Sequence, residues 1–393
     1  MKSISIKAKV ITVSTCCLLV GGAALVELVR NSYHKNVGMV AASALSSAQK
    51  TFDNLKGGEL GGLTLASTGL ANLQGVRELF VKRDRDALYA YVLPMINELK
   101  TLGAGFVLFL EPDGKVFLRV HAPKNFGDSL MSSTYIRKAI QTQATSEAVD
   151  LARPGFISGS CRPFRDESGK VIGYIIVSAT FDKFLTGMKQ QTADDYILIG
   201  HKKFLDEKLY RNSQKAKGLP DTWDQFPSVV VLGKTIEPYA NGNYENDLEG
   251  LSADGKLLGQ GEKDDRAFIR GVFPIHDAVG TPIGGIFLRH DITALYQGMR
   301  RVQTTAVVAI ALLMLLLSVA MALMLNRLVF LRLKRTMETA TRVVGGEFSE
   351  QIIPASDDEV GKLELLFEQF RSIFVGVVDD LSKLQEQVDK KSA

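Results

Sequence analysis

The sequence predicts an α+β membrane protein with two spans, two mixed α/β modules between the spans, and a helical coiled coil after the second span. Two uncharged apolar runs, at residues 10–26 and 302–325, are long enough to cross a bilayer as helices. Between them, short apolar stretches alternate with Asp-Gly and Gly-rich turns, which is typical of antiparallel strands. After the second run, apolar residues recur three and four positions apart, as in a coiled coil.

The chain begins with a membrane signal. Lys2, Lys7 and Lys9 form a short basic segment, residues 1–9, before the first apolar run. A cleaved signal peptide has the same order of parts. However, the run is long for a signal peptide, lacks a clear small-x-small cleavage site, and continues as a helical pattern past Arg30. We therefore predict an uncleaved transmembrane helix over residues 10–29.

Positive charges predict the orientation of both spans. Four basic side chains lie at or just after the end of the second predicted span, residues 302–326: Arg327, Arg332, Lys334 and Arg335. Lys and Arg are in excess on the cytoplasmic side of membrane segments. Both spans carry more of them on the sides away from the central region, so we expect two cytoplasmic termini and residues 30–301 outside the membrane.

The central region begins as helix and continues as a first α/β module. Helical periodicity extends to about residue 55, and glycines in residues 57–62 predict an interruption. The other expected elements are helices at 63–81, 86–102 and 133–142, and strands at 106–110, 116–121, 155–164 and 171–179. The order of strand, Asp-Gly turn, strand, helix and hairpin resembles a PAS-like sheet.

A second module repeats this order with a long variable stretch, residues 201–247, inserted after its first strand. Its expected strands are residues 196–200, 267–275 and 283–289. Phe-Pro-Ile, Gly and Ile-Gly in residues 273–284 are similar to Arg-Pro-Phe, Gly and Ile-Gly in residues 162–173. This weak internal repeat predicts two tandem copies of one fold.

One motif carries a family resemblance for the central region. The Arg-x-His-x-Pro-x-x-x-Gly-Asp run of residues 119–128 and the closing Gly-x-x-Ile-Gly hairpins resemble the double Cache domain of bacterial chemoreceptors and sensor kinases. The resemblance covers residues 31–297. It implies a membrane-distal module at 63–182, a membrane-proximal module at 196–291, and a small-molecule pocket on one face of a sheet. It also implies a bacterial inner membrane with the sensor in the periplasm.

The segment after the second span is predicted to form two helices. The first has its apolar seam at Leu333, Met337, Ala340 and Val344, and ends at the Gly-Gly-Glu-Phe connector of residues 345–348. A capping box at residues 356–359, beginning with Ser356, starts the second helix. The second seam has nine apolar positions: Val360, Leu363, Phe367, Phe370, Phe374, Val377, Leu381, Leu384 and Val388.

This helix–connector–helix order resembles a HAMP domain over residues 327–381, followed by a short coiled-coil tail at 382–393. Its signature residues would be Gly346, Asp358, Glu359 and Gly361. The family usually has a proline early in the first helix, where this chain has Arg332. The resemblance implies a parallel four-helix coil in a homodimer that relays motion from the membrane. A plain juxtamembrane coiled coil is the alternative.

Alternation along two strands yields candidate ligand-binding residues. Phe117, Arg119 and His121 are expected on one face of their strand, opposite Val116, Leu118 and Val120. On the later hairpin the residues expected to share a face are Phe156, Ser158, Ser160 and Arg162. If the two faces converge, paired guanidinium groups would suit a carboxylate. In the related citrate- and dicarboxylate-sensor kinases, an Arg and a nearby His on this strand contact the ligand.

Structural roles are the alternative for the same residues. Arg119 and His121 could close the loop that contains Pro123, Gly127 and Asp128. Arg162 is the stronger candidate for a ligand contact, because turn geometry does not require an arginine before the proline of its hairpin. Aromatic side chains of the second module could line a pocket or belong to the core: Tyr196, Trp223 and Phe268.

Composition excludes several classes of protein. The net charge of +4 is small and dispersed, so nucleic acid is not an expected partner. The three cysteines and five histidines form no metal-ligand pattern, and no cofactor motif is present. No phosphate loop or nucleophile elbow appears, and the tail after residue 381 is too short for a catalytic core. We therefore do not expect an enzyme.

The sequence thus predicts a homodimeric membrane receptor without catalytic residues. A small extracytoplasmic ligand, such as a carboxylate, would bind the double Cache domain. A HAMP domain would relay the change to a separate cytoplasmic signalling protein, most simply of the chemotaxis type. Two alternatives remain: the truncated input half of a methyl-accepting chemotaxis protein or sensor histidine kinase, and a ligand-free scaffold that pairs with another HAMP protein.

Overall fold

The computed structural model describes residues 6–101, 103–152, 155–238, 242–263, 265–354 and 357–392. It divides into two units. We call Lys35–Gln297 the sheet unit, and we call Met1–His34 with Gly298–Ala393 the helical unit.

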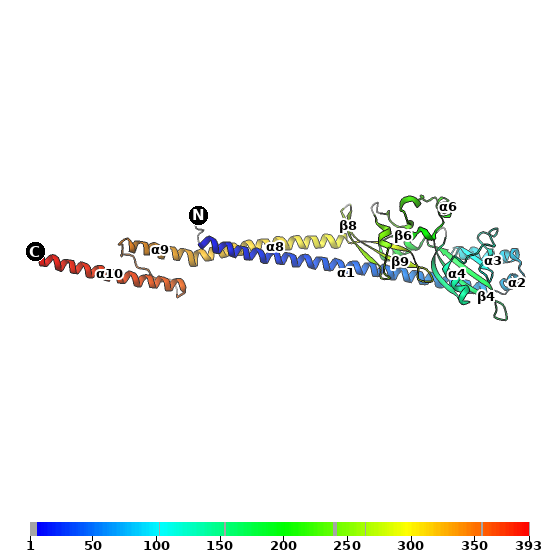
Figure 1. The fold of residues 1–393 in the computed structure, drawn as a ribbon, viewed down its shortest axis with the longest axis horizontal. Helices are drawn as coiled ribbons and strands as arrows, with labels where there is room; N and C mark the ends of the chain where they lie inside the picture. Colours follow the sequence, from blue (N-terminus) through cyan, green and yellow to red (C-terminus); the bar gives the residue numbers. More distant parts are fainter. Residues whose placement is uncertain are drawn as a thin grey trace. The chain divides into compact units, whose positions relative to one another are not determined.

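The sheet unit contains two five-stranded antiparallel sheets of the same topology (Figure 1). The first has the order β2-β1-β5-β4-β3, with β1 Phe106–Leu110, β2 Val116–Arg119, β3 Ser146–Ala152, β4 Gly155–Arg165 and β5 Val171–Thr180. The second has the order β7-β6-β10-β9-β8, with β6 Asp195–His201, β7 Val229–Lys234, β8 Lys256–Lys263, β9 Arg266–His276 and β10 Pro282–Asp291. Each strand of the second sheet thus occupies the place of its counterpart in the first, as the sequence repeat predicts. We call the two halves the first and second modules.

Helices cover the sheets and connect the modules. They are α1 Ile6–Asn72, α2 Gln74–Val81, α3 Arg85–Thr101, α4 Thr134–Thr142, α5 Phe184–Thr192, α6 Glu207–Lys217 and α7 Tyr244–Leu248, with short turns η1 Lys202–Phe204 and η2 Trp223–Gln225. Three edge strands, β3, β7 and β8, were not expected from the sequence. The strand β2 ends at Arg119, two residues earlier than predicted.

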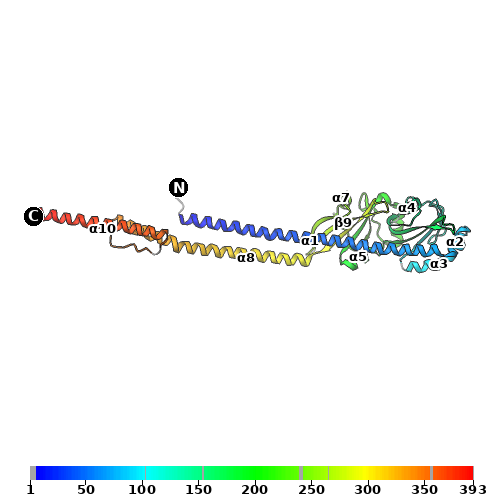
Figure 2. The same ribbon diagram turned by 90° about the horizontal axis from the view of Figure 1, so that it is seen from below.

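Within the sheet unit, α1 lies along one face of both sheets (Figures 1 and 2). Its Leu63 and Leu70 join the first module's core with α2 and α3. Its Leu45 and Phe52 join the second module's core, where the Phe52 ring lies 5.3 Å from the ring of Phe184. One helix therefore anchors both modules through separate apolar clusters.

The predicted interruption at residues 57–62 is wrong, because α1 continues unbroken to Asn72. The four glycines of this stretch are exposed, and an added Cβ would meet no atom within 4 Å at any of them. A glycine in a helix interior costs about 1 kcal/mol relative to alanine. The burial of Leu60 and Leu63 on the opposite side of the helix offsets this cost.

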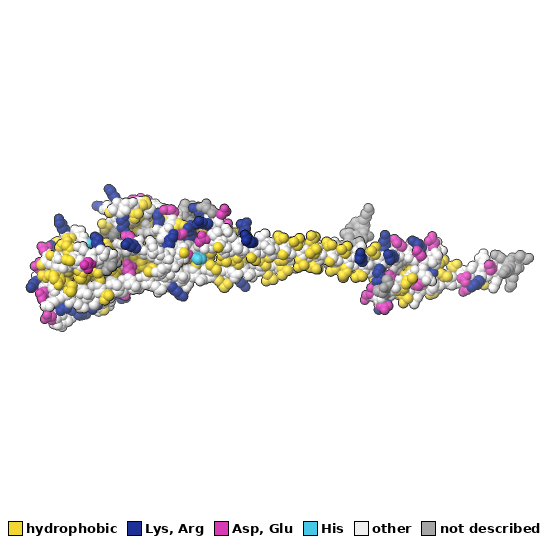
Figure 3. Space-filling model, turned by 180° about the vertical axis from the view of Figure 1, so that it is seen from behind, with side chains coloured by type: hydrophobic (Ala, Val, Ile, Leu, Met, Phe, Trp, Pro, Cys, Tyr) yellow, Lys and Arg dark blue, Asp and Glu magenta, His cyan; other side chains and the backbone are white. Residues whose placement is uncertain are grey.

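The helical unit contains two helical segments long and apolar enough to cross a membrane, within Thr12–Asn72 and Thr293–Val344. Figure 3 shows a band of hydrophobic side chains without charged ones, with Lys and Arg at each end. In this band an added Cβ at Gly22 would lie 3.2 Å from Met314, so α1 and α8 (Thr293–Leu325) pack closely there.

A π-helical turn, Asn326–Phe330, joins α8 to α9 (Leu331–Val344) without a break. Arg332, at the position of the expected proline, donates to Asp358 at 2.9 Å and to the buried Glu364 at 2.8 Å. These bonds join α9 to α10, Glu359–Ser392.

The connector between α9 and α10 has a defined geometry at both ends. Gly346 follows α9 with φ +90°, which a residue with a Cβ rarely adopts. The predicted cap residue Ser356 lies outside the described residues. Within the described residues, Asp358 caps α10, since its carboxylate accepts a hydrogen bond from the backbone N–H of Gly361 at 2.8 Å. An apolar groove between α9 and α10 is lined by Ala340, Val343, Val344, Ile352, Phe367, Phe370, Arg371 and Phe374.

Candidate functional site

Arg119 holds the loop that follows β2. Its guanidinium donates two hydrogen bonds to Asp128, at 3.0 and 3.2 Å, and one to the carbonyl of Asn125 at 2.9 Å. Gly127 in the same loop has φ +88° and donates its N–H to Val116 at 2.8 Å. Arg119 therefore has the structural role of closing this loop, which was the alternative to a ligand contact. The positive charge of its guanidinium is already matched by the carboxylate of Asp128. Pro123 lies on the same loop, half-buried.

His121 lies beyond the end of β2, so strand alternation does not place it beside Arg119. Its ring meets Phe106 edge-on at 4.8 Å between centroids. A register shift in the β1–β2 pair also changes the expected faces, because Phe117, Leu118 and Val120 all join the core under α2 and α3. The predicted grouping of Phe117, Arg119 and His121 is therefore wrong.

Phe156, Ser158 and Ser160 share a face of β4, as predicted, but that face lies against α1. Ser158 and Ser160 are fully buried. Ser158 donates to Glu59 of α1 at 2.9 Å, and Ser160 lies 2.8 Å from the Thr64 hydroxyl. Burial raises the pKa of Glu59, and the Ser158 hydrogen bond opposes that rise. Phe156 belongs to the core that α1 shares with the second module.

Arg162 lies on the same face of β4 and is half-buried. Within the described part of the chain, its side chain makes no hydrogen bond or ion pair. Arg162 therefore stays a prediction as a ligand contact.

The predicted convergence of the two groups in the first module is wrong. Cross-strand neighbours share a face, and they link Arg119 to the following residues: Leu108, Ile176 and Cys161. Arg119 thus lies on the face opposite Ser160 and Arg162. The face that includes Cys161 is filled by Tyr135 of α4, which is 1% exposed. An added Cβ at Gly159 would lie 2.5 Å from the Tyr135 ring, so this ring packs directly on the strand backbone.

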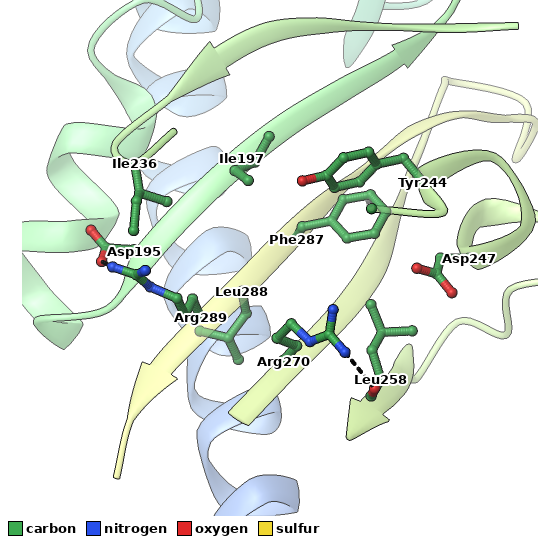
Figure 4. Close-up of a pocket in the computed structure, with 11 residues that line it drawn as sticks. Asp195, Ile197, Ile236, Tyr244, Asp247, Leu258, Arg270, Phe287, Leu288 and Arg289 are labelled. Atoms are coloured by element: carbon green, nitrogen blue, oxygen red, sulfur yellow. Dashed lines mark hydrogen bonds and ion pairs between the residues drawn. The ribbon is translucent and has the colours of Figure 1, made fainter. Parts of the chain in front are cut away.

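The equivalent face of the second module is hollow. A small cavity of about 20 Å³, open to solvent, lies on the side of the sheet away from α1 (Figure 4). It is lined by Asp195, Ile197, Ile236, Gly242, Tyr244, Asp247, Leu258, Arg270, Phe287, Leu288 and Arg289. Most of this lining is apolar, with two carboxylates and two guanidinium groups, which is a common composition for a small-molecule site.

Strands β6, β9 and β10 supply the charged groups of this cavity, together with α7. Asp195 and Arg289 are joined at 2.6 Å, and Lys189 also contacts Asp195 at 2.6 Å. These two cations lower the pKa of Asp195 against the opposing effect of burial. Arg270 and Asp247 lie at the other end in Figure 4.

Sequence reasoning missed this cavity. Part of its lining comes from α7 and β8, which were not expected, and the rest comes from β6, β9, β10 and the loop before α7. The aromatic residues proposed for a pocket here are not among the lining residues: Tyr196 is in the core on the α1 side, Trp223 packs with Tyr210, and Phe268 is buried. Arg270, inside a strand of otherwise apolar character, was the one available signal.

The strand that floors the cavity continues into the second apolar helix. Asp291 ends β10 and accepts a hydrogen bond from the Thr293 N–H at 2.8 Å, at the start of α8. The adjacent His290 lies 2.7 Å from the carboxylate of the buried Asp194. This contact raises the pKa of His290, against the opposing effect of burial.

The His290–Asp194 contact predicts a pH-dependent stability. A histidine whose pKa is raised by folding contributes its stabilisation below the unfolded value, about 6.5, and loses it as pH rises through the folded value. The free energy of unfolding of the protein should therefore fall as pH rises from about 6.5. Denaturant unfolding at a series of pH values tests this. In a His290→Gln variant, the free energy of unfolding should fall less steeply as pH rises. An unchanged dependence on pH would contradict the assignment of this effect to His290.

Among the residues that the structure describes, no group of three His, Cys, Asp or Glu side chains could hold a metal ion.

Residues 61–296 match the family described as "Double sensory domain of two-component sensor kinase" (dCache_3). The match covers more than half of the chain, so the chain belongs to this family of double Cache sensory domains. The two modules of the sheet unit are its two halves. No curated protein matches the chain.

Three solved structures are similar in fold. The periplasmic domain of Vibrio cholerae LuxQ is 14% identical with a TM-score of 0.39, over 64% of this chain and 99% of that chain. The sensory domain of the Campylobacter jejuni chemoreceptor Tlp3 with isoleucine bound is 12% identical, with a TM-score of 0.41, over 67% and 96%. A domain of a sensory box/GGDEF family protein from Vibrio parahaemolyticus is 14% identical, with a TM-score of 0.37, over 66% and 97%.

Proposed function

We propose that the protein is a two-span bacterial inner-membrane receptor whose periplasmic double Cache domain binds a small ligand and whose cytoplasmic helices relay the signal. The observation that carries this proposal is the path from the cavity to α8. Strand β10 contributes Phe287, Leu288 and Arg289 to the cavity, and α8 begins at Thr293, just after the strand ends. A ligand that shifts β10 would therefore move the start of the second apolar helix.

We assign residues 327–381 to a HAMP domain, with the tail at 382–393. Gly346 at the connector and Asp358, Glu359 and Gly361 at the start of α10 support the assignment. Along α10 a stripe of apolar side chains is exposed, including Phe370 at 61% and Leu381 at 59%. One apolar stripe needs a partner, and a second copy of the chain would cover it in a homodimer.

The relay would work by repacking of this bundle between two arrangements. A ligand can shift that balance only by its different affinity for the two states. The output would be read by a separate cytoplasmic signalling protein, of the chemotaxis type. The alternatives are the input half of a methyl-accepting chemotaxis protein or sensor histidine kinase, and a scaffold that binds no ligand.

Cysteine labelling in intact cells tests the topology. In a background of Cys16→Ser, Cys17→Ser and Cys161→Ala, a membrane-impermeant maleimide should label Lys208→Cys directly. It should label Glu347→Cys only after lysis, because both positions are exposed but would lie on opposite sides of the membrane. Equal labelling of the two positions in intact cells would contradict the two-span topology.

Disulfide cross-linking in membranes tests the dimer and the relay. Leu381→Cys should cross-link two copies, while Lys383→Cys, on another side of α10, should do so much less. A compound from a panel of small carboxylates, amino acids and amines should change the rate at which Leu381→Cys forms the disulfide between two copies. Equal cross-linking at both positions would contradict the parallel coil.

A further inference from the structure

Two charged pairs of different kinds hold the end of β10. Strands β6 and β10 are paired as far as Asp195 and Arg289, whose side chains are joined at 2.6 Å. Asp194 and His290 lie one residue beyond this last pair of the two strands and are joined at 2.7 Å. An arginine keeps its charge at any pH that a cell meets, whereas a histidine loses its charge near neutrality. The outer of the two pairs is therefore the one that titrates.

Asp194 depends on His290 for its countercharge. The side chain of Asp194 is 6% exposed, and His290 is its one cationic partner within the described residues. A buried carboxylate that loses the positive charge of its partner is strongly destabilised. The side chain of His290 is 30% exposed, so the ring can exchange a proton with water. The neutral ring can still donate a hydrogen bond, but the charge that offsets the burial of Asp194 is then gone.

The loop that carries Asp194 is held by its own hydrogen bonds. It joins α5 to β6, and Ala193 in this loop adopts a left-handed φ of +62° with its N–H bonded to the last turn of α5. The hydroxyl of Thr192 accepts the N–H of Asp194 at 3.2 Å and lies 2.7 Å from the hydroxyl of the buried Tyr196. A weakened contact should therefore be relieved on the side of His290.

That side is the start of the second apolar helix. Asp291 caps α8, since it accepts the N–H of Thr293 at 2.8 Å. Ile292 donates its N–H to the carbonyl of Ala267 at 2.9 Å, so β9 holds the same segment from the other edge of β10. Loss of the His290 contact would thus release one side of this junction without separating the sheet, with the permanent ion pair before it as a fixed point.

The charges around the contact are matched among themselves. The elements next to it carry the following charged side chains: Lys189 of α5, Asp195 of β6, Arg266 and Arg270 of β9, and Arg289 and Asp291 of β10. Lys189 is bound to Asp195, as Arg289 is, and the charge of Arg266 acts on Asp291. Helix α1 has no titratable side chain at residues 36–49, and α8 has none at residues 293–297. Asp194 raises the pKa of His290 against the effect of burial, and the charge of Asp291 adds to the rise.

The other histidines of the sheet unit lie in different surroundings. Burial lowers the pKa of His121 to about 4 and also lowers the pKa of His201. His276 is exposed at the end of β9. Within the described residues, His290 is the one histidine of this unit that is joined to a carboxylate. A response of the sheet unit to pH near neutrality is therefore expected at His290.

We propose that the protein also senses extracytoplasmic pH: protonation of His290 fastens the start of α8 to the loop before β6, and deprotonation releases it. The inference rests on the proposed receptor function and adds the proton as a second stimulus. Acid would stabilise one arrangement of the relay, and alkaline medium the other. The proton can shift this balance because its affinity for His290 differs between the fastened and the released states.

Hydrogen exchange tests the junction in the full-length protein purified in detergent. After correction for the intrinsic effect of pH, the amides of residues 290–297 should exchange about threefold faster or more at about pH 8 than at about pH 6. His290→Gln keeps a hydrogen-bond donor but is uncharged at either pH, so its two rates should be equal. Asp194→Asn should also give equal rates. His276→Gln is the matched control and should respond as the unaltered protein does.

Cross-linking in intact cells tests whether the change reaches the cytoplasmic helices. The rate at which Leu381→Cys forms the disulfide should differ about twofold or more between media of about pH 6 and about pH 8. The difference should disappear when His290→Gln is added. An effect of pH on the cross-linking chemistry itself would remain in both proteins, so the comparison removes it.

Every other outcome overturns the inference. A pH response of the exchange rates that persists in His290→Gln, or that is lost in His276→Gln, would place the titrating group elsewhere. Equal exchange at the two pH values in the unaltered protein would mean that His290 does not fasten the junction. A response in exchange without one in cross-linking would mean that the contact only stabilises the sheet unit. The maleimide labelling and the compound panel, at constant pH, still decide the receptor function independently.

Discussion

Gly284→Ala should lower the free energy of unfolding of the sheet unit by about 3 kcal/mol, because an added Cβ has no room. It would lie 2.2 Å from the carbonyl oxygen of Ile199 and 2.9 Å from the Phe156 ring. The oxygen belongs to the neighbouring strand, so relief requires the β6–β10 pair to separate. Denaturant unfolding at constant pH measures the change.

Gly187→Ala is the matched control. Gly187 lies in α5, and its added Cβ would meet only Leu55 at 3.8 Å, an ordinary contact. That variant should be as stable as the original protein or slightly more stable, because alanine favours helix over glycine. If Gly284→Ala were equally well tolerated, the close approach of β10 to β6 would be incorrect.

Phe52→Ala should lower the free energy of unfolding by about 4 kcal/mol, which is within the range found when a large core side chain is removed. Phe52 is 3% exposed and its ring contacts Phe181, Phe184 and Phe273 at centroid distances of 6.5, 5.3 and 5.6 Å. These rings come from two segments that pack on α1, so the cavity would lie where α1 meets the second module. Thermal or denaturant unfolding of the protein tests this.

Phe52→Leu separates volume from aromatic contact. Leucine keeps much of the buried volume, so it should cost less than half as much as alanine. Equal losses of stability in the two variants would mean that the aromatic contacts, and not the buried volume, set the contribution of Phe52. A small loss of stability in Phe52→Ala would contradict the burial of Phe52 between α1 and the second module.

Much of the fold followed from local patterns. Six strands have a neighbour on each side in their sheet: β1, β4, β5, β6, β9 and β10. Their alternating or apolar runs, bounded by Gly turns, were sufficient to predict them as strands. The edge strand β8 was missed for a physical reason. β8, Lys256–Lys263, is exposed along most of its length, so it has no apolar face to give a pattern.

The candidate site was harder to predict than the fold. Alternation along β4 correctly grouped Ser158, Ser160 and Arg162, because the side-chain period of a strand is local. Alternation does not say which face of the sheet meets α1. That depends on packing between segments about a hundred residues apart, such as Glu59 and Ser158. His121 was misplaced because β2 ends at Arg119, two residues before it.

Two glycine patterns had opposite meanings that sequence alone did not separate. The exposed glycines of residues 57–62 suggested a break, but α1 continues through them. The Ile-Gly pairs that end at Gly173 and Gly284 suggested only a repeat. In the structure both are sites of close backbone approach, with added Cβ atoms 2.4 and 2.2 Å from carbonyl oxygens of β1 and β6.

The π-helical turn at Asn326–Phe330 sets the rotational phase between α8 and α9. A residue advances an α-helix by about 100°, and a π turn accommodates one residue more than the corresponding α-helical turn. Conversion of this turn to regular α-helix, or deletion of one residue within it, would rotate the seam of α9 by about 100°. The number of residues in this turn therefore sets the rotation of the α9 seam relative to α8. Adding or removing one residue would turn the seam toward a different side of the helix.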